Sequence, residues 1–271
     1  MATELEEQRW QELKAHMERG GAADVVRYIE TIPDPEMRRT VYAAAQKGFA
    51  NKDWTGKNFD ALIEVVTAGI GETLQQALLT ENGEETWKLT EFANILSYNL
   101  SADLAECWPG DENPRERRHF EAGLRAAEDC VRWRRELGKP PERRAMAYWA
   151  VGMHQLSLGN SYEALGAFET AAGLSRVAVV GTGRDEIKAG GDFAVLLYAG
   201  YLGIARWVLG EAGGKEAFES ACAAFEETAE KYDGEQREDA TFGLNQLRWV
   251  ATKFSSAGRV PAASGLEGGP A

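Results

Sequence analysis

The sequence predicts an all-α fold in which antiparallel helical hairpins stack in series. Apolar residues recur at helical spacing over nearly the whole chain, and short segments rich in glycine, proline and asparagine separate the periodic stretches. A hairpin pattern also recurs, because the spacing Gly-x5-Leu-Gly at residues 152–159 returns at residues 203–210, 51 positions later. Only residues 176–182 read as a strand, and one strand cannot form a sheet.

The N-terminal part contains five amphipathic stretches. Gly20 and Gly21 stop the first stretch, Asp34 and Pro35 supply an N-cap and a first helical position, and Asn58 is a further N-cap candidate. The expected helices are residues 5–17, 25–32, 35–49, 59–79 and 85–108.

The C-terminal part continues as helix pairs, for a total of about eleven helices. A loop rich in turn formers spans residues 108–116, and Gly138, Gly159 and Gly210 mark helix ends. The expected helices are residues 115–137, 142–158, 161–174, 193–209, 215–232 and 237–254. Residues 1–254 are expected to form a single domain, with a division into 1–110 and 115–254 as the alternative. The Gly-, Ala- and Ser-rich residues 255–271 are predicted to be disordered.

The repeated hairpin resembles the tetratricopeptide repeat. At residues 145–174, Gly152, Ala164, Phe168 and Ala171 match the spacing G-x11-A-x3-F-x2-A of that family. Gln155 stands where the family prefers tyrosine, and the proline that often ends the repeat is absent. A second, degenerate copy at residues 196–230 needs a two-residue insertion to match. The offset of 51 residues between the copies is about 17 residues longer than the family's repeat.

This resemblance implies a non-catalytic scaffold or adaptor that binds a protein or peptide in a concave groove. The first helices of the pairs would line that groove with Met146, Trp149, Met153 and Trp207, side chains suited to apolar recognition. The alternative for these side chains is a place in the hydrophobic core. A possible homo-oligomer with a structural role is a further expectation.

A second candidate binding feature is a cluster of arginines. Residues 115–144 carry ten basic and six acidic residues, a net charge of +4 in a chain of net charge -13. Arg115, Arg118, Arg132 and Arg135 could bind an anion or an acidic peptide. The alternative is a solvated helix face whose arginines pair with glutamates at helical spacing.

The stretch "RVAVVGTGRDE" (176–186) is similar to a strand entering a phosphate-binding turn. Gly181 and Gly183 are in place, but Glu186 stands where the dinucleotide fingerprint has its third glycine, and a helix precedes the stretch. We expect no nucleotide site here. We expect a buried extension of the preceding helix, or a packed linker, that ends in a glycine-rich loop.

No other pattern indicates catalysis, a cofactor or a metal. Glu116 and His119 form an E-x-x-H pair, but di-iron sites that use such pairs need a second one, which the sequence lacks. His154 is expected to be packed or to face the groove. The sequence therefore predicts a protein that is not an enzyme. The alternative is an all-α small-ligand-binding protein or enzyme with a pocket between helices, bordered by the loops at 108–114 and 181–191.

Composition excludes several partners. A net charge of -13 opposes a nucleic-acid backbone. The longest uncharged apolar run, residues 193–205, is shorter than the roughly 20 residues of a membrane span. The charged N-terminus lacks the apolar core of a signal peptide, and three well-separated cysteines suit a reducing compartment. We therefore expect a cytoplasmic protein that binds neither nucleic acid nor membrane.

Overall fold

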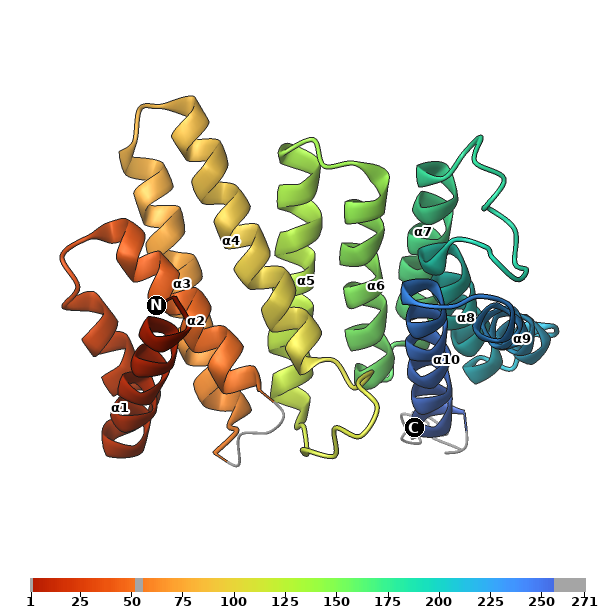
Figure 1. Ribbon diagram of the computed structural model, residues 1–271, viewed down its shortest axis with the longest axis horizontal. Coiled ribbons are helices and arrows are strands. Elements are labelled where there is room, and N and C mark those ends of the chain that lie inside the picture. The colour runs from red at the N-terminus through yellow and green to blue at the C-terminus, as the bar shows by residue number, and fades with distance from the viewer. Residues whose placement is uncertain (1, 52–55, 256–271) are drawn as a thin grey trace, which may run out of the picture.

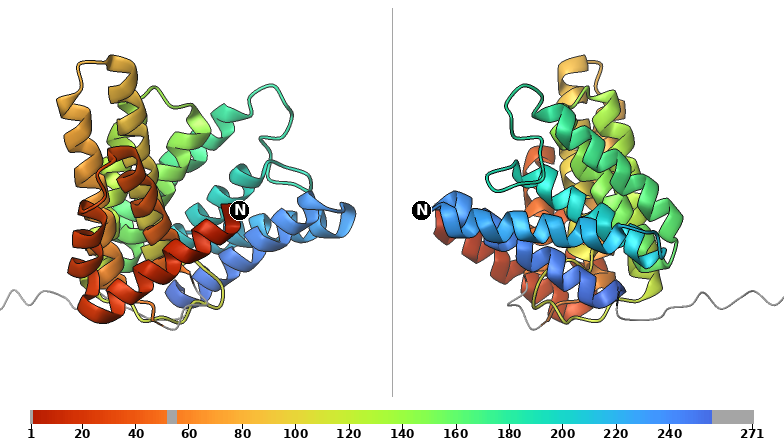
Figure 2. Two further views of the ribbon diagram at one scale, coloured as in Figure 1. Left: turned by 60° about the vertical axis from the view of Figure 1, so that its left-hand side comes forward. Right: turned by 90° about the vertical axis from the view of Figure 1, so that its right-hand side faces the viewer.

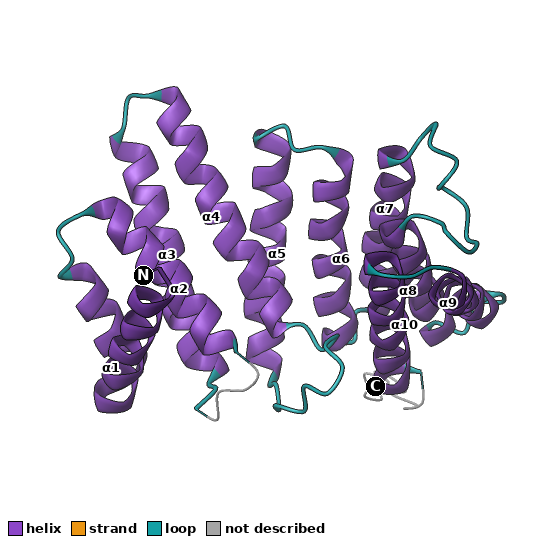
Figure 3. Ribbon diagram, viewed as in Figure 1, coloured by secondary structure: helices purple, strands orange, loops and turns teal. Residues whose placement is uncertain are grey.

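The chain folds into α-helices joined by loops, of which those at residues 105–116 and 179–192 are long (Figure 1, Figure 3). The computed structural model describes residues 2–51 and 56–255, and these residues form ten helices and no strand. The all-α prediction is confirmed. The helices are α1 (Ala2–Glu30), α2 (Pro35–Ala50), α3 (Phe59–Leu79), α4 (Gly83–Leu104), α5 (Arg117–Glu136), α6 (Pro141–Leu158), α7 (Ser161–Ala178), α8 (Phe193–Val208), α9 (Gly214–Lys231) and α10 (Glu235–Phe254).

Successive helices pack against each other in chain order along the long axis of the molecule (Figure 1). The even-numbered helices also contact one another in sequence, from α2 through α4, α6 and α8 to α10. We call the face that these helices share the even-helix face. Helix direction changes along the chain, so that α9 and α10 are strongly inclined to α3 and α4 (Figure 2).

Local sequence signals set the helix ends. The backbone leaves the helical region at Gly20 and at Gly21, whose φ of 68° is left-handed, so α1 consists of two helical segments with a kink between them. These two segments account for the eleven helices that the sequence predicts. Asp34 accepts a hydrogen bond from the Glu36 amide at 3.0 Å, and Asn58 accepts one from the Ala61 amide at 3.1 Å.

The repeated hairpin is held together by the contact that its spacing predicts. A Cβ atom at Gly152 of α6 would lie 2.5 Å from Cε1 of Phe168 of α7, so only glycine permits this approach. Phe168 in turn stacks on Tyr201 of α8, with ring centroids 5.4 Å apart. In the second hairpin, Gly203 of α8 lies equally close to the Phe218 backbone of α9. The small residue therefore sets the interhelix distance in both copies.

The core consists of two clusters of buried side chains. One joins α1 to α5 and includes Leu62, Leu96 and Leu100, and the other joins α4 to α10 and includes Phe168 and Leu247. Helices α4 and α5 contribute to both clusters. The division of the chain into one domain or two stays a prediction.

The segment that reads as a strand is not one. Helix α7 continues to Ala178, and a turn with left-handed glycines at 181 and 183 follows. The expected extension of the preceding helix is confirmed, but the prediction that this extension is buried was wrong. Val177 is 57% exposed and Val180 is 74% exposed.

Two further expectations concern the chain as a whole. Helix α10 ends at Phe254, and Ser255 is its C-cap. The rest of the tail that is predicted to be disordered, residues 256–271, lies outside the described residues. Among the described helices, none combines the length and the apolar character that crossing a bilayer requires.

Candidate functional site

Two of the four predicted groove side chains lie in the core. Trp149 is 4% exposed and Met153 is fully buried, both in the same cluster as Cys107 and Leu247. Their place on an open groove was wrong, and the alternative of core packing describes them. Neither side chain is accessible to a partner in this arrangement.

This burial involves segments far apart in the sequence, since the Trp149 ring packs on Tyr201 of α8 with centroids 6.1 Å apart and the residues after α4 belong to the same core cluster. Residues 105–108, which follow α4, extend to α10: the rings of Trp108 and Phe242 lie 6.3 Å apart, and Lys253 Nζ lies 3.7 Å from Glu106 Oε1. Ala105, Cys107 and Trp108 thereby lie in or against the core cluster that contains Trp149 and Met153. Helical spacing within α6 carries no information about these contacts.

Met146 and Trp207 are only partly buried. Trp207 packs on Phe218, with ring centroids 5.8 Å apart, and Lys215 Nζ lies 5.7 Å from the Trp207 ring centroid. Trp207 therefore covers the α8–α9 hairpin. Its role in binding, like that of Met146, stays a prediction.

Of the four predicted anion-binding arginines, three are held by carboxylates of the chain itself. Arg115 is buried, with 1% of its side chain exposed, and its Nη2 lies 2.8 Å from Asp111 Oδ2. Arg118 binds both carboxylate oxygens of Asp60 at 2.8 Å. Arg132 pairs with Asp129 at 2.7 Å.

Arg135 differs from these, since it is exposed and has no ion pair within the described ranges. The four guanidinium groups therefore do not form one free anion site. Arg132 alone follows the alternative of pairing at helical spacing, with an aspartate of α5, whereas Arg115 is buried beside a loop residue and Arg118 binds Asp60 of α3.

The E-x-x-H pair, Glu116 and His119, caps the N-terminus of α5. The backbone amide of Glu116 donates to Nδ1 of His119 at 3.0 Å, and Nε2 of His119 lies 3.1 Å from Asp60 Oδ1. Together with the Glu116 side chain this forms a capping box. Over the described part of the chain, no group of three or more His, Cys, Asp or Glu side chains is arranged to hold a metal ion.

The even-helix face instead carries an open groove between α2 and α4, of about 770 Å³, which we call the inner groove. Trp108 forms one end of it. Its apolar wall consists of Ala43, Ala50, Phe92, Ile95, Ala102 and Trp108, and its polar groups come from Gln46, Lys47, Asn51, Asn99 and Asp103.

The polar groups of the inner groove include acceptors without an internal partner. Gln46 is 3% exposed and donates its side-chain N–H to the Leu96 carbonyl at 3.1 Å. Its own carbonyl oxygen accepts no hydrogen bond from the residues that the structure describes, and the same holds for the Asp103 carboxylate. Burial raises the pKa of Asp103 to about 7, although the cations of Lys57 and Arg115 lower it in part.

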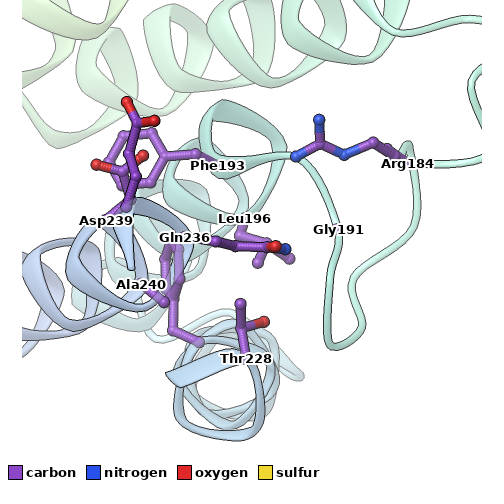
Figure 4. Close-up of a pocket in the computed structure, with 10 residues that line it drawn as sticks. Arg184, Gly191, Phe193, Leu196, Thr228, Gln236, Asp239 and Ala240 are labelled. Atoms are coloured by element: carbon purple, nitrogen blue, oxygen red, sulfur yellow. The ribbon is translucent and has the colours of Figure 1, made fainter. Parts of the chain in front are cut away.

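A second, smaller cavity of about 340 Å³ lies between α8, α9, α10 and the loop that follows α7 (Figure 4). We call it the loop pocket. Its floor is apolar, and charged side chains stand at its rim. It is lined by Arg184, Gly191, Phe193, Leu196, Phe225, Thr228, Glu235, Gln236, Asp239 and Ala240.

The two loops that the sequence singled out as rims border different cavities. Trp108 borders the inner groove, and Arg184 and Gly191 border the loop pocket. The amides of α2 and α4 were missed, because Gln46 and Asn99 carry no motif of their own. Their signal is only that α2 and α4 become neighbours on the even-helix face.

Comparisons with known proteins identify no relative. No protein-family model matches the chain, and neither a curated protein nor a solved structure matches it. The resemblance to tetratricopeptide repeats therefore rests on the spacing at residues 145–174 and on the helical repeats themselves.

Proposed function

We propose that this protein is a non-catalytic scaffold, built as a tetratricopeptide-like α-solenoid, that binds an extended segment of a partner protein in the inner groove. The buried free thiols of Cys107, Cys130 and Cys222 suit a reducing compartment, and we place the scaffold in the cytoplasm. The repeated hairpin and the series of contacts along the even-helix face support the solenoid.

One observation carries this proposal: the inner groove combines carboxamides with exposed apolar side chains. A carboxamide can donate and accept at once, so it matches the alternating N–H and C=O groups of a peptide main chain. Gln46 offers an unpaired carbonyl oxygen at the floor, and Asn99 is exposed beside it on α4. Ile95, which is 46% exposed, provides a contact for an apolar side chain of the same segment.

The charges of the groove favour a segment of low net charge. Lys47 on one wall is positively charged, and Asp103 on the opposite wall, with its pKa raised to about 7, carries part of a negative charge at neutral pH. The chain as a whole has a net charge of -13, so a strongly acidic segment would be repelled. We therefore expect a neutral or weakly basic, apolar segment. This replaces the acidic peptide considered for the arginine cluster.

The test is a selection of random linear peptides displayed on phage against the immobilised full chain. Selected peptides are synthesised, and their affinities are measured for the wild type, Ile95→Glu and Asn99→Arg. Both changes are at exposed positions, so the fold should persist. We expect each change to weaken binding at least about tenfold, or about 1.4 kcal/mol.

Matched controls carry the same chemistry away from the inner groove. Val177→Glu places a carboxylate at an exposed aliphatic position of α7, and Asn245→Arg places a cation on the exposed side of α10. These two should bind the peptides as the wild type does. A selection that yields no peptide, or peptides that bind both groove variants at full strength, would overturn the proposal.

A further inference from the structure

The loop pocket has the size and the apolar floor of a site for one small molecule. Its volume of about 340 Å³ is at the lower end of the range for ligand cavities, roughly 300–1,000 Å³. Phe193 of α8 and Phe225 of α9 form the floor together with Leu196. The two phenylalanine rings pack on each other with centroids 5.8 Å apart, so this surface is fixed by the core beneath it.

Opposite charges stand on the two sides of this floor. Glu235 and Asp239 lie one turn apart at the start of α10, and neither has an ion pair in the described part of the chain. Two carboxylates at this spacing repel each other, so a cation between them would be stabilised. Arg184 stands on the opposite rim, and its guanidinium points over the pocket (Figure 4).

The loop that carries Arg184 is anchored to the surrounding helices. The Gly190 amide donates to Thr228 Oγ1 of α9 at 3.0 Å, and the Asp192 amide donates to the Arg184 carbonyl at 2.9 Å. The Arg184 side chain makes only a long contact of 3.8 Å with Asp192. The guanidinium therefore keeps donors for a further anion while its backbone is held in place.

We propose that the loop pocket binds a free α-amino acid with an apolar side chain. The ammonium group lies between the carboxylates of Glu235 and Asp239, the carboxylate meets Arg184, and the apolar side chain rests on the floor of Phe193, Leu196 and Phe225. Both charges of such a ligand meet a group of opposite sign, so neither is left unpaired in a partly desolvated site. This site is independent of the inner groove.

The first experiment is isothermal titration calorimetry of the full chain with three ligands of one shape. Leucine carries both charges, leucinamide lacks the carboxylate, and 4-methylpentanoate lacks the amine. We expect leucine to bind and each of the other two to bind at least tenfold more weakly. Absence of heat with leucine, phenylalanine and valine would overturn the proposal, and so would equal affinity for leucine and both analogues.

Variants then locate the site. Asp239→Asn and Arg184→Gln remove one charge each from exposed side chains, and both should weaken leucine binding at least tenfold. Glu238→Gln on α10 and Lys188→Gln in the loop remove charges that do not line the pocket, and both should leave the affinity unchanged. Binding that survives both pocket changes would place the amino acid elsewhere and overturn the assignment. Peptide binding in the inner groove should be the same in all four variants.

Discussion

Gly123 of α5 lies directly against the imidazole of His154 of α6, so that a Cβ atom at Gly123 would come within 2.2 Å of Cε1 of that ring. The ring is fully buried, and its Nε2 lies 2.9 Å from the carbonyl oxygen of Ser101 on α4. Three helices therefore meet at one imidazole. The absence of a side chain at Gly123 is what allows this approach.

Replacing Gly123 with alanine should destabilise the fold. The new methyl group would press on a ring that Ser101 holds in place, and overpacking of this kind costs about 1–3 kcal/mol. The gain in helix propensity, about 1 kcal/mol, offsets only part of this cost. The free energy of unfolding in urea should fall.

The matched control is Gly166→Ala in the middle of α7. Gly166 is exposed, and apart from its chain neighbours and the backbone of its own helix no described atom lies within 4 Å of a Cβ atom placed there. Only the higher helix propensity of alanine then affects stability, so Gly166→Ala should raise the free energy of unfolding by about 0.5–1 kcal/mol. A Gly123→Ala protein as stable as Gly166→Ala would contradict the close contact.

His154 should make stability depend on pH between about 4 and 6.5. Burial lowers the pKa of His154 from 6.5 to about 4, because a proton added at Nδ1 would have no acceptor there among the described residues. The unfolded chain therefore binds a proton that the folded chain excludes over this interval, and stability is lost as the pH falls through it. The full loss is about 3 kcal/mol.

The measurement compares the wild type with His154→Gln in urea at several pH values. The glutamine cannot take up a proton. The free energy of unfolding of the variant, relative to the wild type, should therefore rise as the pH falls from 6.5 to 4. A difference that does not change with pH would show that the imidazole is not buried in its neutral form.

Ionisation of Asp103 should make stability depend on pH in the opposite sense to the ionisation of His154. The pKa of this carboxyl is raised to about 7 from 3.8, so the folded chain holds a proton that the unfolded chain has released between these values. Stability then falls as the pH rises from about 4 to 7. Asp103→Asn removes this ionisation. The free energy of unfolding of the variant, relative to the wild type, should therefore be higher at pH 8 than at pH 4, by at most about 4 kcal/mol. Melting temperatures at the two pH values check this, and a larger advantage at low pH would contradict it.

Trp149→Ala should lower stability strongly. Trp149 is buried between α6 and α8, where its ring packs against Tyr201 with centroids 6.1 Å apart. Truncation of a buried tryptophan costs about 3–5 kcal/mol. Thermal unfolding followed by circular dichroism measures the loss, with Val177→Ala at the exposed end of α7 as control. A melting temperature equal to that of Val177→Ala would show that Trp149 lies on an open surface.

Local signals in the sequence were sufficient for the helices. Asp34 and Asn58 cap α2 and α3 as their positions predict, and Gly20 and Gly21 break α1. The spacing of Gly152 and Phe168 also predicted a true contact between neighbouring helices. These features depend on residues close in the chain, where propensity, capping and periodicity act directly.

Accessibility could not be predicted in this way. Helical spacing placed Trp149 and Met153 on a face of α6, but packing with Tyr201 of α8 and with the residues after α4 covers this face. Arg118 was expected to be available for an anion, but Asp60, 58 positions earlier, binds it. A long-range contact of this kind leaves no trace in local periodicity.

The sequence by itself determined that the chain is helical, where its helices begin and end, and that small residues bring paired helices together. Only the tertiary structure decided which faces stay open, because cavities form between helices that are distant in the chain. The inner groove depends on the distance between α2 and α4, and the loop pocket depends on where the loop after α7 meets α10. Both candidate sites are therefore products of packing, and the side chains that line them are ordinary helix residues until that packing is known.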